Sequence, residues 1–366
     1  MKVPYLFLKQ ENTEFKTEIM NSISNCLDNS YFILGPESKK FEENIAKLIN
    51  VKYAIGVNSG TDALFLALKA LNIGNGDEVI TVANSFIATA NVIKIAGAIP
   101  VFVDIKENGL IDETKIEGKI TNKTKAIMPV HLSGKPCNMD EIMNIAKKYN
   151  LRVIEDAAQA ITAKWQNKAV GSFDVGIFSL HPLKNLSACG DAGILTTNDK
   201  EIYEKILLLR NHGLKNRNEQ EIIGYNSRLD ELQASILNIK LNKLDNVTLK
   251  RRSNAELYQK LLQGISGINY IPYDKENEFS VYHTFIIRVK KRDELFKYLN
   301  ENGIECKIHY PLTINEQREF TKYDKGDLIK TNKYKTEIIS LPIHQYLTRD
   351  QIEFVVAKIR RFYGKF

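Results

Sequence analysis

Short apolar runs alternate with segments of helical spacing from residue 53 to residue 210, and this alternation limits the possible folds more than any other feature. The apolar runs predict strands over 54–57, 77–82, 100–104, 126–130, 152–155, 175–180 and 193–197. Between them, the spacing of apolar residues predicts helices over 63–71, 84–96, 139–149 and 199–210. Strands that alternate with helices form a largely parallel sheet covered on both faces, so we expect an α/β fold.

The chain is long for one hydrophobic core, and we predict two domains. At 366 residues it exceeds the size at which single cores usually stop growing. An amphipathic helical lead-in over 1–36 and a helix over 39–48 precede the alternating pattern. Near residue 240 the pattern changes, within a long helix expected to continue past Leu244. Beyond it we expect helices over 252–262, 292–302 and 349–363 and a strand over 282–289. The prediction is a large domain, 1–240, and a smaller α+β domain, 241–366.

Composition narrows the class of protein without naming a function. The formal charge of +7 is spread over the chain with no basic stripe interleaved with aromatic residues, which argues against nucleic acid as a partner. Four cysteines lie far apart with no metal-ligand spacing, so we expect reduced thiols, a cytoplasmic protein and no metal. No apolar stretch approaches the length of a membrane span.

Polar or flat side chains follow several of the predicted strands. In parallel sheets, ligands lie beyond the carboxyl ends of strands, where Thr61, Phe86, Asp156 and Ser179 are expected. The turn 58–61 consists of small residues before a helix, an arrangement that leaves backbone N–H groups free to face a phosphate. An ordinary helix cap explains the same turn.

Asp156 stands at a strand end among small apolar residues. A carboxylate placed there is costly unless it meets a cation or a hydrogen-bond donor. The pyridinium nitrogen of pyridoxal 5′-phosphate is such a partner, and its protonation makes the cofactor ring an electron sink. The alternative is that Asp156 caps a helix that follows it.

Lys184 lies in a glycine-broken loop between two strands, within the stretch 174–198. A lysine amine whose charge is suppressed by partial burial or by a neighbouring cation is a nucleophile that forms a Schiff base with an aldehyde. For one residue among 51 lysines and arginines, a solvated loop lysine is the ordinary alternative.

Several spaced motifs together resemble the DegT/DnrJ/EryC1/StrS family of sugar aminotransferases. The resemblance covers nearly the whole chain, from Gly35-Pro36 to Leu341-Pro342-Ile343-His344. Its motifs occur in the family's order: Ser59-Gly60-Thr61-Asp62, Asn84-Ser85-Phe86, Glu155-Asp156-Ala157-Ala158-Gln159, Phe178-Ser179, Lys184, Gly190-Asp191-Ala192-Gly193 and Gly224-Tyr225-Asn226-Ser227-Arg228. The resemblance implies the fold of transferases that depend on pyridoxal 5′-phosphate (PLP), of the aspartate aminotransferase type. This fold has a mostly parallel mixed sheet flanked by helices.

The same resemblance implies roles for individual residues around the cofactor. Lys184 would form the Schiff base and then move a proton as a base, while Asp156 would pair with the ring nitrogen. Gln159 would lie against the ring hydroxyl. Phe86 would stack on the ring, although a plain core aromatic is more common.

Further residues are implied for the phosphate and the substrate. Gly60, Thr61, Asp62 and Ser179 would hold the cofactor phosphate, and Asn226 would reach it from a neighbouring subunit, which implies a homodimer with shared active sites. The tentative substrate residues are His181, His309 and Tyr310. For His181, a structural role is equally open.

The implied reaction moves an amino group, by family habit from L-glutamate, to a keto group of a nucleotide-linked (dTDP, UDP or GDP) deoxysugar for surface glycans such as capsule or lipopolysaccharide. A small phosphorylated ketone or a cyclitol ketone is the alternative acceptor, because the segment 312–317 departs from the family's usual ending. A PLP-dependent dehydratase would carry histidine in place of Lys184. A non-catalytic regulator is a further alternative.

Overall fold

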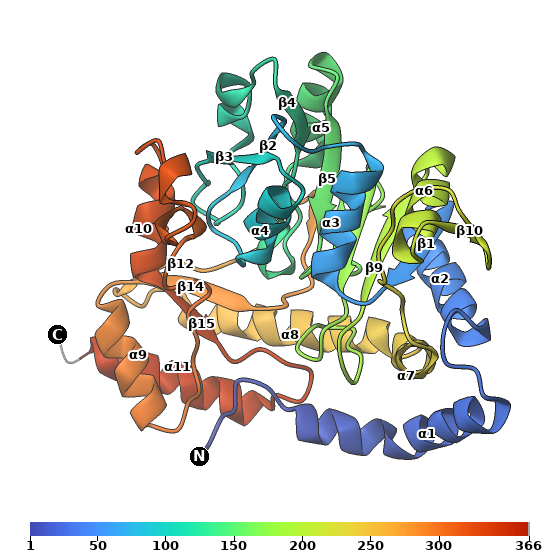
Figure 1. Ribbon diagram of the computed structural model, residues 1–366. Coiled ribbons are helices and arrows are strands. Elements are labelled where there is room, and N and C mark those ends of the chain that lie inside the picture. Colours follow the sequence, from blue (N-terminus) through green and yellow to red (C-terminus); the bar gives the residue numbers. More distant parts are fainter. Residues whose placement is uncertain (365–366) are drawn as a thin grey trace.

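A seven-stranded sheet forms the centre of the protein in a computed structural model that describes residues 1–364 (Figure 1). Its spatial order is β1-β9-β8-β5-β4-β2-β3. The strands are β1 Tyr53–Val57, β2 Glu78–Val82, β3 Ile99–Val103, β4 Thr124–Ile127, β5 Arg152–Asp156, β8 Val175–Ser179 and β9 Gly193–Thr197. Strand β9 runs antiparallel to both of its neighbours, and all other pairs are parallel. The predicted α/β fold with a mostly parallel mixed sheet is confirmed.

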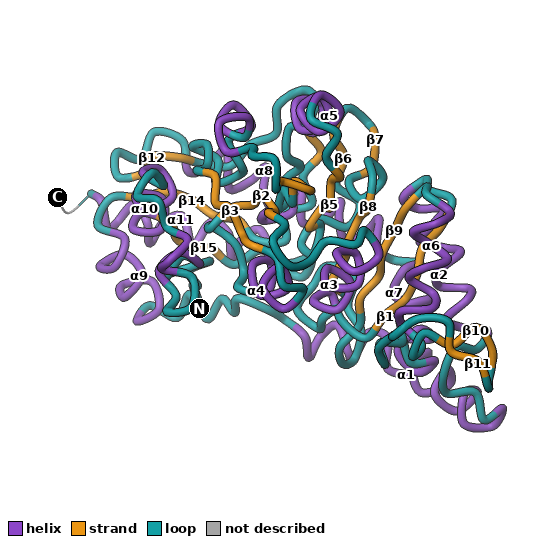
Figure 2. The backbone as a smooth tube through the Cα atoms, turned by 45° about the horizontal axis from the view of Figure 1, so that its top comes forward, coloured by secondary structure: helices purple, strands orange, loops and turns teal. Residues whose placement is uncertain are grey.

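Helices cover both faces of this sheet (Figure 2). One face packs against α3 Gly60–Ala70, α4 Ala88–Ile95 and α6 Lys200–Arg210, and the other against α2 Pro36–Ile49, α5 Met139–Lys148 and α7 Glu231–Leu241. Adjacent strand residues such as Val153 and Ile154 point to opposite faces and enter different core clusters. Burial on both faces explains why the strands are nearly continuous apolar runs.

Side-chain caps fix where several helices begin. The Ser59 hydroxyl accepts a hydrogen bond from the backbone N–H of Asp62 at 3.0 Å and so caps α3. Asp199 caps α6 in the same way. The helix α11, Arg349–Tyr363, begins with a capping box of Thr348 and Gln351.

The long helix expected to continue past Leu244 is interrupted, so that prediction is wrong at one point. Helix α7 ends at Leu241, and α8, Leu244–Leu262, starts after Asn242 and Lys243. These two residues make tighter hydrogen bonds, to Ile239 and Lys240. The helix predicted over 252–262 is the C-terminal part of α8.

The C-terminal part of the chain builds a second, smaller core. A three-stranded sheet in the order β12-β14-β15 packs with α8, α9 and α11, and the N-terminal Val3 joins this core. The domain boundary near residue 240 stays a prediction, and residues 365 and 366 of the predicted small domain lie outside the described residues. The remaining elements are α1 Leu8–Asn29, α9 Arg292–Glu301, α10 Ile329–Glu337, β6 Lys164–Trp165, β7 Lys168–Ala169, β10 Leu214–Asn216, β11 Glu219–Gln220, β12 Ile268–Tyr270, β13 Glu278–Phe279, β14 Phe285–Val289 and β15 Ile338–Leu341, with short 3-10 helices at 113–115, 117–119, 132–134, 314–316 and 321–323.

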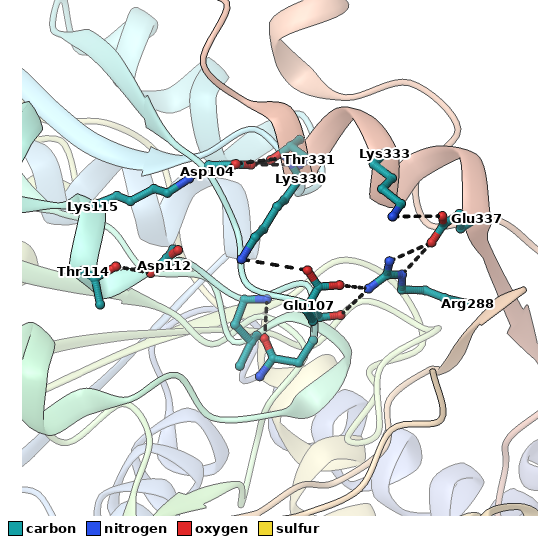
Figure 3. A network of polar contacts seen from close by, with 12 residues as sticks. Asp104, Glu107, Asp112, Thr114, Lys115, Arg288, Lys330, Thr331, Lys333 and Glu337 are labelled. Atoms are coloured by element: carbon teal, nitrogen blue, oxygen red, sulfur yellow. Dashed lines mark hydrogen bonds and ion pairs between the residues drawn. The ribbon is translucent and has the colours of Figure 1, made fainter. Parts of the chain in front are cut away.

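Polar contacts join this C-terminal part to the large sheet (Figure 3). Asp104, directly after β3, accepts hydrogen bonds from the backbone N–H groups of Lys330 and Thr331 at the start of α10. Burial alone would raise the pKa of Asp104, but these donors lower it below its ordinary value. Arg288 on β14 contacts Glu107 and Glu337. The two parts are therefore held in a defined relation around the cavity described below.

Across residues 1–364 no helix has the length and apolar character that crossing a bilayer requires. The same part of the chain contains no group of three histidine, cysteine or acidic side chains placed to hold a metal ion. All four cysteines are free thiols.

Gly193 on β9 packs against the turn before α3, and a substitution at this position tests that packing. A Cβ atom added there would lie 2.2 Å from the Ser59 carbonyl oxygen and 2.6 Å from the Gly60 nitrogen, both backbone atoms that cannot rotate away. We expect Gly193→Ala to lower the free energy of unfolding by about 1–3 kcal/mol in urea denaturation of the cofactor-free protein. Gly118→Ala is the matched control, because nothing lies within 4 Å of its added Cβ. Equal stability of the two variants would contradict this packing.

Candidate active site

A cavity of about 390 Å³ opens where the parallel strands end. Thr61 follows β1, Phe86 follows β2, Asp156 ends β5 and Ser179 ends β8, and all four line this cavity. The expectation that these strand ends meet is therefore met by the structure.

Ten of the twelve predicted site residues line the cavity, and two do not. Those that line it are Gly60, Thr61, Phe86, Asp156, Gln159, Ser179, His181, Lys184, His309 and Tyr310. Asp62 lies in the first turn of α3, where its backbone N–H serves the cap of Ser59. Asn226 lines a neighbouring recess instead.

Lys184 and Asp156 line the same cavity, and the charge of each acts on the pKa of the other. Burial lowers the pKa of the Lys184 amine from 10.5 to about 8, although the charge of Asp156 opposes this shift. Burial likewise raises the pKa of Asp156, while Thr89, Ala158 and the charge of Lys184 lower it. The amine is therefore partly neutral near physiological pH, which is the state of a nucleophile.

Asp156 is held by hydrogen bonds that the sequence did not predict. The Thr89 hydroxyl donates to Asp156 Oδ2 at 2.8 Å, and the backbone N–H of Ala158 donates to Oδ1 at 3.3 Å. The Ser85 hydroxyl lies 2.8 Å from the Thr89 hydroxyl. The carboxylate is thus both buried and oriented.

Gln159 is oriented by contacts on both ends of its amide. Its Oε1 accepts a hydrogen bond from the Ser133 N–H at 2.7 Å, and its Nε2 donates to the Tyr310 hydroxyl at 3.3 Å. Because Tyr310 comes from the C-terminal part of the chain, this contact joins both parts of the protein across the cavity.

Histidines form the wall of the cavity that the C-terminal part contributes. Burial, together with the charge of Lys184, lowers the pKa of His309 to about 4 and that of His283 well below its ordinary value. Their rings are neutral at physiological pH and can accept hydrogen bonds from hydroxyl groups. His181 is exposed at the rim, where its Nδ1 accepts the Leu183 N–H at 3.3 Å.

The N-terminus of α3 approaches Ser179 closely, because residue 60 is glycine. A Cβ atom at Gly60 would lie 2.7 Å from the Ser179 Cβ atom. The first turn of α3 and the Ser179 hydroxyl therefore face one small space, which suits a phosphate group. With the Lys184 amine and the Asp156 carboxylate in the same cavity, the residues present fit pyridoxal 5′-phosphate.

A polar recess of about 360 Å³ lies beside the cavity. Asn226 is exposed in it, and Arg228 and Asn58 also line it. Asp191 lines both the recess and the cavity. In one chain, then, Asn226 stays outside the cavity that holds Lys184.

Sequence reasoning missed Ser85, Thr89 and His283 as lining residues. Thr89 follows Phe86 by three residues, and this helical spacing was a usable signal. His283 carried no such signal, because it reaches the cavity from a distant segment.

Fold and cavity together define a pyridoxal-phosphate-binding enzyme of the aminotransferase class. Residues 13–360 match the DegT/DnrJ/EryC1/StrS aminotransferase family. The chain belongs to this family, and it is a PLP-dependent aminotransferase. The resemblance inferred from the motifs is confirmed.

The chain is similar to several relatives over nearly its whole length. It is 43% identical to a pleiotropic regulatory protein of Geobacillus stearothermophilus, covering 100% of both chains. It is 42% identical to a dTDP-3-amino-3,6-dideoxy-alpha-D-galactopyranose transaminase of Aneurinibacillus thermoaerophilus, covering 98% of this chain and 99% of the relative. It is 34% identical to a 3-oxo-glucose-6-phosphate:glutamate aminotransferase of Bacillus subtilis, covering 97% and 82%.

A solved structure shares the fold closely. The crystal structure of DesV from S. venezuelae in complex with a ketimine intermediate superimposes with a TM-score of 0.96. The two sequences are 37% identical, and the match covers 99% of this chain and 98% of DesV.

The lowered pKa of Lys184 predicts when its amine reacts. In cofactor-free protein, competitive acetylation followed by mass spectrometry should show the reactivity of Lys184 rising through about pH 8. In Asp156→Asn, the midpoint should move lower still, because the Asp156 charge favours the protonated amine. A midpoint at the ordinary 10.5 would contradict the buried environment of Lys184.

Proposed function

We propose that this enzyme transfers an amino group from L-glutamate to the keto group of a nucleotide-linked deoxysugar. The observation that carries the proposal is the similarity, over nearly all of both chains, to a transaminase named for a dTDP-linked aminosugar. The neutral His283 and His309 give the cavity hydrogen-bond acceptors suited to sugar hydroxyls.

A sugar phosphate is the second candidate acceptor. A relative is named for 3-oxo-glucose-6-phosphate as acceptor and glutamate as donor. That name supports glutamate as the donor for either acceptor. Intact Lys184 and Asp156 favour turnover over a purely regulatory role, although one relative is named a regulatory protein.

The bound cofactor supplies an aldehyde that condenses with amines and a ring that withdraws electrons. We assign the phosphate to Ser179 and the α3 N-terminus at Gly60 and Thr61, because Asp62 does not line the cavity and its backbone N–H is bonded to Ser59. The Asp156 carboxylate would balance the charge of the protonated ring nitrogen, and Gln159 would donate toward the ring hydroxyl through its second amide N–H.

Phe86 and Lys184 have the remaining proposed roles. The Phe86 ring would form the stacking wall of the cavity, and 55% of its surface is exposed and open to a ligand. The Lys184 amine, with its pKa of about 8, would take up and return the proton at the amine-bearing carbon. His181, His309 and Tyr310 would contact the acceptor.

Asn226 is proposed to complete the cofactor site of a second copy of the chain. Its side chain is exposed in the polar recess and does not line its own cavity. A two-fold homodimer would bring each Asn226 to the partner's site. We further propose a cytoplasmic reaction that supplies aminosugars for surface polysaccharide such as capsule or lipopolysaccharide, in keeping with the four free thiols.

Lys184→Ala tests the chemistry directly. We expect this variant to lose the visible absorption band of the bound cofactor and at least about 10³ of turnover, within the range for loss of a general base. In the unaltered enzyme, L-glutamate alone should convert the band. Lys39→Ala is the control, because Lys39 is exposed on α2. If L-glutamate leaves the cofactor band unchanged, the assignment of glutamate as the amino donor is wrong. Assays with dTDP-, UDP- and GDP-linked ketosugars and with sugar phosphates then identify the acceptor.

Mixed dimers test the role of Asn226. Lys184→Ala and Asn226→Asp should each be inactive as homodimers, the second because a carboxylate would repel the cofactor phosphate. A refolded equal mixture should recover about a quarter of the full activity, since half of the dimers are mixed and each has one intact site. No recovery would place Asn226 and Lys184 in the same chain's site.

A further inference from the structure

We propose that Thr89 is a positioning residue that keeps the Asp156 carboxylate ionised and aimed at the cofactor ring, and that Ser85 sets the direction of the Thr89 hydroxyl. The inference deepens the proposed function, because it rests on the pairing of Asp156 with the ring nitrogen. It concerns two hydrogen bonds in series, from Ser85 to Thr89 and from Thr89 to the Asp156 carboxylate.

Both hydroxyl-bearing residues and the aspartate are buried. Thr89 is 1% exposed, Ser85 is 5% exposed, and Asp156 is 5% exposed. All three residues line the cavity. Water does not readily replace a hydrogen bond that is lost in such a site. The loss of one therefore makes the ionised form of the carboxylate less stable.

Each hydroxyl group has one proton, and this fixes which group donates in each of the two hydrogen bonds. An ionised carboxylate only accepts, so Thr89 donates its single proton to Asp156 Oδ2 at 2.8 Å. The Ser85 hydroxyl, 2.8 Å from the Thr89 oxygen, must then donate to it. The Ala158 N–H donates to the other carboxylate oxygen at the longer distance of 3.3 Å, so Thr89 provides the closer contact.

One turn of the chain also links Thr89 to the proposed stacking ring. The backbone N–H of Thr89 donates to the Phe86 carbonyl at 3.2 Å, just where α4 begins. The turn that presents Phe86 to the cavity therefore presents Thr89 to Asp156. A merely structural role would have Thr89 stabilise this turn and leave the carboxylate unaffected.

The carboxylate and the ring nitrogen compete for one proton. Each hydrogen bond to the ionised carboxylate lowers its proton affinity and leaves the proton on the ring. Without the Thr89 donor, the proton should move toward Asp156, and the ring should become a weaker electron sink.

Nitrogen NMR of the holoenzyme, loaded with cofactor labelled with ¹⁵N in the ring, tests this directly. In Thr89→Val, which keeps the shape and removes the hydroxyl, the ring signal should move toward the neutral pyridine position. Thr89→Ser should restore the signal of the unaltered enzyme, and Ser85→Ala should give a smaller move in the same direction. An unchanged signal in Thr89→Val with bound cofactor would overturn the inference.

A second measurement covers loss of cofactor in the valine variant. In folded, cofactor-free protein, the ¹³Cγ signal of Asp156, identified by its absence in Asp156→Asn, should titrate about one pH unit higher in Thr89→Val than in Thr89→Ser, the scale expected for one hydrogen bond to a charged group. Equal titration of the two variants would overturn the inference. A neutral ring nitrogen in the unaltered holoenzyme would instead overturn the proposed pairing of Asp156.

Discussion

A half-buried lysine and a buried aspartate share one cavity, and the site depends on this constraint. Burial disfavours both charges, so each residue needs the other or a ligand. The pKa of Lys184 is lowered to about 8, and Asp156 accepts hydrogen bonds from Thr89 and Ala158. The two charges therefore destabilise the cofactor-free protein. A ligand with an aldehyde would react with the lysine amine, and its basic ring nitrogen would pair with the aspartate.

The sheet topology makes this arrangement possible. Parallel strands end at the same edge, so residues that follow β1, β2, β5 and β8 meet although they are far apart in the sequence. Strand β9 runs in the opposite direction and brings Gly193 against the turn before α3. The helix N-terminus proposed for the phosphate is therefore set by backbone packing.

The C-terminal part contributes one side of the cavity, the side proposed above to contact the acceptor. His283, His309 and Tyr310 line it, and the contact of Tyr310 with Gln159 joins them to residues near the proposed ring position. The contacts of Asp104 with α10 and of Arg288 with Glu107 fix this part against the large sheet (Figure 3). The shape of this side of the cavity thus depends on how the two parts of the chain are joined.

The sequence by itself determined the strand pattern, the residues at the strand ends and, through its motifs, the family, because these depend on local spacing and residue type. It did not reveal the break at Asn242, where neither glycine nor proline marks the end of α7. Only the tertiary structure placed Thr89 on Asp156 and His283 in the cavity, because packing between distant segments decides which buried polar groups meet. The exposed position of Asn226, beside its own cavity and not within it, was likewise decided by the folded chain.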